Sequence, residues 1–146
     1  MVKSLHDMGA TLDRLLAVSV LLNEDATQSL AKEGLTLPRA HLLWHLHHQG
    51  PSTQRVLAEA LRVSPRNITG LVDGLAEAGF VTRGPHPTDR RATLVSLTVR
   101  GTASMAQMTR DHQGLARLLF EDLADFEAFA AGLTHVLNQL NEALGR

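Results

Sequence analysis

Residues 61–97 read LRVSPRNITGLVDGLAEAGFVTRGPHPTDRRATLVSL and carry clear signals for the start and end of a helix. Ser64 is a favourable N-cap because its hydroxyl can accept a free backbone N–H of the first helical turn, and Pro65 suits the first helical position. Gly79 supplies the left-handed residue that ends many helices. Between these signals one helical face is apolar and the other is polar. The two faces are Ile68, Leu71, Val72 and Leu75 against Arg66, Asn67, Thr69 and Asp73. The sequence therefore predicts an amphipathic helix from Ser64 to just before Gly79.

A shorter helix and a hairpin flank this helix. Residues 54–61 form the shorter helix, and only Arg62 and Val63 separate it from Ser64, so the pair is a helix-turn-helix. Its predicted inward residues are Val56, Leu57, Ala60 and Leu61. Residues 80–83 and 92–97 are β-prone and enclose a basic segment rich in Pro and Gly, which is typical of a hairpin. A helix-turn-helix followed by a hairpin is a winged helix.

The rest of the chain is predicted to be helical. A long helix over residues 5–33 ends at Gly34, and a second begins at the cap Thr36, with Pro38 in its first turn, and ends near His48. Thr98 caps a fifth helix, and a last helix runs from about Asp122 to Leu144. The fold class is therefore mainly α with a small β-hairpin wing.

The predicted organisation is one domain over residues 1–146, in which residues 36–97 form the winged helix. The helices of residues 1–34 and 98–146 carry apolar stripes and are expected to form the dimerisation region of a two-fold homodimer. The alternative is a monomer whose helices fold back on their own core, although 146 residues offer little core for six helices.

Composition excludes several classes of protein. The chain is 44% hydrophobic and 20% charged, which is ordinary for a globular protein. No apolar run reaches the ~20 residues that cross a bilayer, and the N-terminus lacks a signal-peptide core, so we expect a cytoplasmic protein without membrane contact. The absence of Cys excludes disulfides, thiolate metal sites and cysteine redox switches. We expect no cofactor.

The charge is divided along the chain although the net formal charge is only −1. Residues 51–100 hold seven arginines against four acidic residues, a net charge of +3, and residues 101–146 hold three arginines against six acidic residues, a net charge of −3. Arginine suits bidentate contact with phosphate or guanine. The positive half coincides with the predicted winged helix, although a local fluctuation of surface charge would give the same count.

Several motifs in order resemble the MarR-type transcriptional regulators (multiple antibiotic resistance regulator family). They are Leu71-Val72-Asp73-Gly74-Leu75, Gly79-Phe80-Val81-Thr82-Arg83, Asp89-Arg90-Arg91, Leu97-Thr98 and Gly101. The resemblance runs from about the first helix to the last. It implies a sequence-specific DNA-binding regulator, a ligand-responsive repressor that binds a pseudo-palindromic operator in double-stranded DNA as a homodimer.

The helix that begins at Ser64 is expected to enter the major groove with its N-terminal end. Ser64, Pro65 and the free N–H groups of the first turn face phosphate, helped by the positive helix end. Arg66 could read guanine, Asn67 could read adenine or contact a phosphate, and Thr69 could contact a phosphate or a thymine methyl.

Two glycines interrupt this helix. Gly70 and Gly74 each cost about 1 kcal/mol relative to Ala in a helix interior, so something should compensate for them. At Gly70 close approach to DNA and close packing against another helix are both open.

The hairpin tip carries Asp89, Arg90 and Arg91. Arg91 is placed to enter the minor groove, where narrow A·T-rich stretches attract guanidinium, and Asp89 can hold it in position. By resemblance Arg91 is the minor-groove residue and Arg90 contacts a phosphate. The alternative is a solvated ion pair of little energetic value.

The resemblance also implies a small-molecule effector, often aromatic or anionic. The only tryptophan, Trp44, and its neighbours His41, His45 and His48 are the residues expected to line an effector pocket. The spacing of His41 and His45 could hold Zn²⁺, so a metal-responsive or pH-responsive regulator remains an alternative beside an ordinary histidine face, with no metal site assigned. The histidines expected at the surface are His6, His86, His112 and His135.

Two functions other than DNA binding are compatible with a small helical protein, and the sequence disfavours both. An enzyme is disfavoured because the chain lacks a nucleophile elbow, a phosphate loop, an HExxH motif and a paired-carboxylate motif. A winged helix that binds a protein partner instead of DNA is disfavoured by the basic tip, and salt-dependent DNA binding would separate the two.

Overall fold

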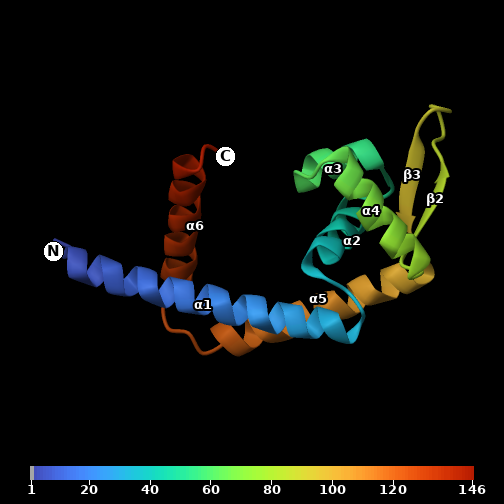
Figure 1. Ribbon diagram of the computed structural model, residues 1–146. Helices are drawn as coiled ribbons and strands as arrows, with labels where there is room; N and C mark the ends of the chain where they lie inside the picture. The colour runs from blue at the N-terminus through green and yellow to red at the C-terminus, as the bar shows by residue number, and fades with distance from the viewer. Residues whose placement is uncertain (1) are drawn as a thin grey trace. The chain divides into compact units, whose positions relative to one another are not determined.

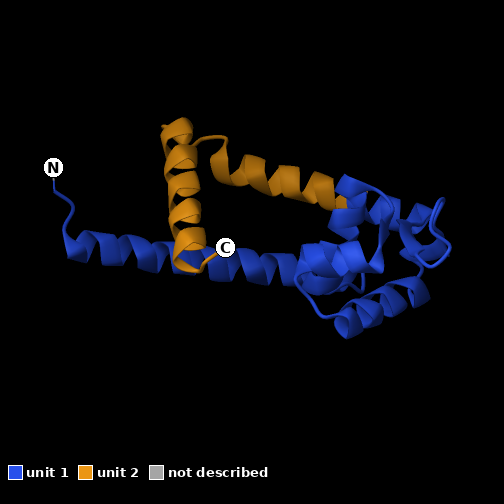
Figure 2. Cartoon of the chain, turned by 90° about the horizontal axis from the view of Figure 1, so that it is seen from above, with its two compact units in different colours: residues 1–105 blue, residues 106–146 orange. Residues whose placement is uncertain are grey.

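A computed structural model describes residues 2–146 and divides the chain into two compact units, one ending at Met105 and one running from Ala106 to Arg146 (Figure 2). Helices dominate both units, and a small sheet lies in the first (Figure 1). The elements are α1 (Leu5–Lys32), α2 (Leu37–Gln49), β1 (Ser52–Thr53), α3 (Gln54–Leu61), α4 (Pro65–Glu77), β2 (Val81–Pro85), β3 (Thr93–Leu97), α5 (Val99–Phe120) and α6 (Phe126–Ala143).

Both helices of the helix-turn-helix are capped by a hydroxyl side chain, and Ser64 is the cap that the sequence predicts. The Ser64 hydroxyl accepts the backbone N–H of Asn67 at 3.1 Å, and α4 begins at Pro65. The Thr53 hydroxyl accepts the N–H of Val56 at 3.2 Å and caps α3. Arg62 ends α3 in the left-handed conformation with φ of 56°, which turns the chain sharply into α4. The helix-turn-helix is therefore confirmed.

The sheet has three antiparallel strands in the order β1-β3-β2. β2 and β3 form the predicted hairpin, with Val81 opposite Leu97 and Pro85 opposite Thr93. The third strand was not predicted, because the two residues of β1 are too few to show an alternating pattern. It places Ser52 opposite Val95, the middle residue of β3. The hairpin is thereby attached to the chain just before α3.

The inward face of α3 was predicted wrongly in part. Val56 is 45% exposed and Ala60 is exposed, whereas Leu57 and Ala58 are buried. The reason is that α3 packs between α2 and α4. The side of α3 that these two helices cover is centred on Leu57 and includes the small side chain of Ala58. A helix of eight residues has only about two turns, so its sequence pattern does not define the buried side clearly.

The core of the first unit lies between α2, α3, α4 and the sheet. The largest fully buried side chains include Leu42, Leu43, Leu57, Ile68, Val72, Leu75, Phe80, Val95 and Met105. The junction of β3 and α5 is closed by Thr98, whose hydroxyl donates to the carbonyl of Gly79 at 2.6 Å and accepts the N–H of Gly101 at 3.0 Å. A Cβ at Gly101 would collide with the carbonyl oxygen of Phe80. Only glycine fits where α5 begins.

The terminal helices expose apolar residues. In α1 only Leu30 is buried, and no residue of α6 is buried. The last helix begins at Phe126 rather than near Asp122. Asp125 has a φ of 55°, a left-handed conformation that does not occur inside a right-handed α-helix. No helix in residues 2–146 is long and apolar enough to cross a membrane.

Candidate nucleic-acid interface

The first turn of α4 presents a free polar surface. Ser64, Pro65, Arg66 and Asn67 are all exposed. The Ser64 hydroxyl accepts one N–H of this turn and keeps its own proton to donate elsewhere. The buried residues of α4 are Ile68, Val72 and Leu75, all on the opposite face. The helix is thus fixed by one side and offers its N-terminal polar side to a partner.

Thr69 is already engaged within the fold. Its hydroxyl donates to the carbonyl of Pro65 at 2.9 Å and accepts Nε2 of Gln54 at 3.1 Å. A hydroxyl has one proton, so this one has none left for a phosphate oxygen. Of the two contacts considered for Thr69, a phosphate or a thymine methyl, the geometry favours the methyl.

The two glycines of α4 have different surroundings. A Cβ at Gly70 would meet no atom within 4 Å, so packing against another helix of the described chain does not account for this residue. A Cβ at Gly74 would collide with the guanidinium of Arg39, which lies across α4 at that point. The end of the flexible Arg39 side chain can move aside, so this contact does not require glycine at Gly74, whereas Gly70 leaves a bare strip of backbone on the exposed side of the helix.

Arg83 joins the hairpin to both helices of the helix-turn-helix. From β2 its Nε and Nη2 donate to Oε1 of Gln54 at 3.2 and 3.1 Å, and Nη2 also donates to Oδ1 of Asp73 at 2.5 Å. The Arg83 side chain is 32% exposed. Since Gln54 also holds Thr69, one network connects β2, α3 and α4. Sequence reasoning placed Arg83 and Asp73 in motifs but did not pair them, because they lie ten residues apart on different elements.

The hairpin tip carries three exposed charged residues. Asp89, Arg90 and Arg91 are all exposed. Oδ1 of Asp89 accepts the backbone N–H of Arg91 at 2.9 Å, a local turn in which the carboxylate fixes the main chain. Asp89 therefore positions Arg91 through the backbone. The ring of His86, expected simply to lie at the surface, accepts two more N–H groups of the tip.

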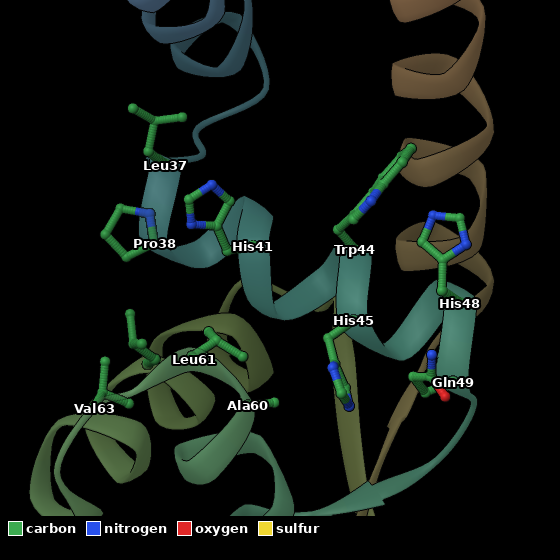
Figure 3. A pocket seen from close by; sticks show the side chains of 11 residues that line it. Leu37, Pro38, His41, Trp44, His45, His48, Gln49, Ala60, Leu61 and Val63 are labelled. Atoms are coloured by element: carbon green, nitrogen blue, oxygen red, sulfur yellow. The ribbon is translucent and has the colours of Figure 1, made fainter. Parts of the chain in front are cut away.

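The candidate effector residues line one pocket in the first unit, which we call the α2 pocket (Figure 3). It has a volume of about 700 Å³ and combines polar with apolar side chains. Its polar residues are His41, Trp44, His45, His48 and Gln49, and its apolar residues are Leu37, Pro38, Ala60, Leu61, Val63 and Leu71. The Trp44 ring meets the His48 ring edge-on, with 4.5 Å between centroids.

One polar atom of this pocket lacks a partner. Nε2 of His45 is buried and makes no hydrogen bond within residues 2–146. The histidine rings do not converge on a point in Figure 3, and no three His, Asp or Glu side chains of the described chain lie close enough to share a metal ion. The metal alternative for this histidine face therefore gains no support from the geometry.

The fold and the exposed basic surface together define a winged helix-turn-helix protein of the DNA-binding class. The MarR family model matches residues 35–93. The HTH-type transcriptional repressor YetL of Bacillus subtilis is 31% identical over 118 residues, which cover 77% of this chain and 69% of YetL. The chain belongs to the MarR family, and it is a DNA-binding transcriptional regulator rather than an enzyme.

Solved structures agree with this assignment. The crystal structure of RV1404 from Mycobacterium tuberculosis has a TM-score of 0.78 and 32% identity, with 100% of this chain and 98% of that chain covered. The DNA complex of MepR from Staphylococcus aureus has a TM-score of 0.67 and 24% identity, with 90% of this chain and 96% of that chain covered. The second similarity supports the fold alone.

Proposed function

We propose that this regulator is a repressor that binds a pseudo-palindromic operator as a homodimer in the cytoplasm, and that a small molecule in the α2 pocket lowers its affinity for DNA. The observation that best supports the DNA-binding surface is the exposed first turn of α4, which is capped and polar and is followed in the next turn by the bare backbone at Gly70. YetL is named a repressor, which supports the direction of regulation.

In this proposal α4 enters the major groove with its N-terminal end. Ser64 and the free N–H groups after Pro65 bind phosphate. Arg66 reads guanine and Asn67 reads adenine or binds phosphate, since both side chains are exposed beside the first turn. Thr69 offers its methyl to thymine, and Gly70 lets the helix backbone approach the DNA.

The hairpin tip reads the minor groove in the same proposal. Arg91, whose backbone is fixed by Asp89, enters the groove, and Arg90 binds a neighbouring phosphate. The presence of Asp89 so near DNA is then explained by its role in shaping the turn.

The test uses anisotropy titrations of a fluorescent duplex that the wild-type protein selects from a random-sequence pool, repeated over a salt series. Arg91→Ala should weaken binding strongly while circular dichroism and the oligomeric state stay unchanged, because the residue is exposed. Arg90→Ala should reduce the slope of log K against log salt by about 2, because each subunit of the dimer loses one phosphate contact. Arg146→Ala removes the same charge at the C-terminus and should change neither quantity. Unchanged affinity of Arg91→Ala would exclude the minor-groove contact.

The homodimer is supported by the exposed apolar side chains of the terminal helices. In α1, Leu12 and Leu16 are 54% and 55% exposed. In α6 the exposed apolar residues are Phe126, Phe129, Leu133, Val136, Leu137 and Leu140. Apolar stripes of this length on a water-facing helix need a partner, and a second copy of the same chain supplies matching stripes through a two-fold axis.

Sedimentation equilibrium tests the dimer directly. The wild type should sediment at twice the mass of 15.9 kDa. Leu133→Glu on α6 should dissociate the dimer and lose the tight component of DNA binding, because one half-site supports only weak binding. His135→Glu, two residues along on the same exposed helix, introduces the same charge at a polar position and is the matched control. A monomeric wild type would overturn the proposal.

The effector is proposed to be a small molecule with an apolar or aromatic body and one hydrogen-bonding group. The apolar side chains of the pocket favour the body, and the histidine and glutamine side chains that line it favour the polar group. Trp44 is the only tryptophan of the chain and lines this pocket, so its fluorescence reports occupancy without a label.

Benzoate and phenol serve as anionic and neutral probes in that titration. Binding at the pocket predicts a saturable change of Trp44 emission, weakened in His45→Leu, and a parallel fall in operator affinity, as linkage requires. A probe that changes the emission while leaving DNA affinity unchanged would show a ligand without regulatory effect and would refute the effector proposal for that class.

A further inference from the structure

The tip of the hairpin is organised around one imidazole ring. Nδ1 of His86 accepts the backbone N–H of Thr88 at 3.1 Å and that of Asp89 at 3.0 Å. The N–H of His86 donates to the carbonyl of Ala92 at 3.4 Å, and the N–H of Ala92 donates to the carbonyl of Asp89 at 3.2 Å. Asp89 in turn holds the N–H of Arg91. A continuous chain of hydrogen bonds thus leads from the His86 ring to the main chain of Arg91.

These contacts fix the protonation state that the tip requires. Backbone amide protons cannot leave their nitrogens, so Nδ1 must present its lone pair to both of them. The Thr88 hydroxyl also lies 3.4 Å from Nδ1 and can donate to the same lone pair, so the contacts fit the tautomer that carries its proton on Nε2. A doubly protonated ring would direct an N–H toward two other N–H groups, and both contacts would become unfavourable.

We propose that His86 is a positioning residue for DNA binding, which uses unprotonated Nδ1 to hold the tip in the conformation that presents Arg90 and Arg91. The inference rests on the proposed contact between the hairpin tip and DNA. A tip without this acceptor leaves two amide groups to solvent and must be ordered when DNA binds, which costs affinity.

Few other charges act on this ring. The charged side chains of the tip are Asp89, Arg90 and Arg91. The two strands that carry the tip hold one charged residue, Arg83, which is engaged with Gln54 and Asp73 at the base of the hairpin. A change of tip geometry with pH can therefore be assigned to His86 by comparison with a variant that does not titrate.

Two substitutions distinguish the role of Nδ1 from that of Nε2. His86→Asn places a carbonyl oxygen where Nδ1 lies and cannot be protonated in the same range, whereas His86→Gln places its oxygen near the position of Nε2. His86→Ala removes both. The experiment measures binding to the selected fluorescent duplex from about pH 8 to about pH 5.5, the range in which histidine changes charge, at the highest salt that still allows measurable binding, so that added charge is screened.

At the upper pH we expect His86→Asn to bind as the wild type does. His86→Gln and His86→Ala should bind at least about thirtyfold more weakly, the effect on an equilibrium constant of losing the two ordinary hydrogen bonds of one tip. As the pH falls, the wild type should lose affinity relative to His86→Asn and approach His86→Ala. In the DNA-free protein, hydrogen exchange at the amides of Thr88 and Asp89 should accelerate over the same pH range in the wild type only.

Arg91→Ala, measured in parallel, distinguishes a failure of the proposed contact between the tip and DNA from a failure of the positioning role of His86. If Arg91→Ala binds weakly while His86→Ala and His86→Gln bind as the wild type does, the positioning role of His86 is overturned and the tip contact stands. If His86→Asn loses as much affinity as His86→Ala, the acceptor is not what matters and the inference is again overturned. If Arg91→Ala binds normally, the tip contact itself fails, and the role of His86 fails with it.

Discussion

Replacement of Gly70 by Ala tests whether the bare strip on α4 is kept for DNA. A Cβ at this position meets nothing within 4 Å in the free protein, and the residue lies inside a regular helix. The substitution therefore adds helix propensity without a clash, and the free energy of unfolding should rise by about 1 kcal/mol. For a chain of this size that corresponds to an increase of about 2–4 °C in melting temperature. Urea unfolding at one fixed protein concentration measures it, because a dimer couples stability to concentration.

DNA affinity should change in the opposite direction. If the DNA backbone lies against Gly70, a methyl group forced into that contact costs about 1–3 kcal/mol, a loss of roughly tenfold to a hundredfold in affinity. Anisotropy with the selected duplex gives this number on the same protein preparation. The expected result is a variant that is more stable and yet binds more weakly.

The same substitution at Gly101 is the matched control, because there a Cβ would strike the carbonyl oxygen of Phe80 and should lower stability by about 1–3 kcal/mol. A Gly70→Ala variant that is less stable than the wild type would show that something packs against this strip in the folded protein. One that is more stable and binds DNA normally would refute close approach of DNA at Gly70.

The hydrogen-bond network of Arg83, the first turn of α4 and the buried core each give a further expectation. Arg83→Met should reduce affinity for the selected duplex more than for random duplex and leave the salt slope unchanged, because Arg83 is engaged with Asp73 and Gln54 rather than free for phosphate. Arg66→Ala should relax preference at one base position of each half-site, seen by repeating the selection with the variant. Leu42→Ala, at a fully buried side chain, should cost about 2–5 kcal/mol in urea unfolding.

The parts of the fold that sequence predicted are those set by local chemistry. A hydroxyl before a proline marked the start of α4, and the Ser64 cap and the left-handed Gly79 are both present. The same holds for Thr98, which caps α5. Such signals depend on residues within one turn of each other, so a single sequence displays them fully.

The features that escaped prediction depend on residues far apart or on the direction of packing. The two residues of β1 become a strand only because β3 pairs with them, and the buried arc of α3 depends on its two neighbouring helices. The pairing of Arg83 with Gln54 spans 29 residues. His86 stood beside a proline in a basic loop, and nothing in that pattern distinguished a surface histidine from one whose Nδ1 shapes the loop.

The pocket shares residues with α4, the helix that we propose to contact DNA, and this bears on how a ligand could control DNA binding. Val63 lies in the turn between α3 and α4, and Leu71 lies on α4; both line the α2 pocket. Val63 also lines a second cavity, of about 650 Å³, with Pro65 and Thr69. A molecule that enters the α2 pocket would therefore press on the same short turn that sets the start of α4. Coupling by this route needs only a small rotation of one helix within one subunit. By linkage it lowers DNA affinity only if the occupied pocket favours an α4 orientation other than the DNA-bound one.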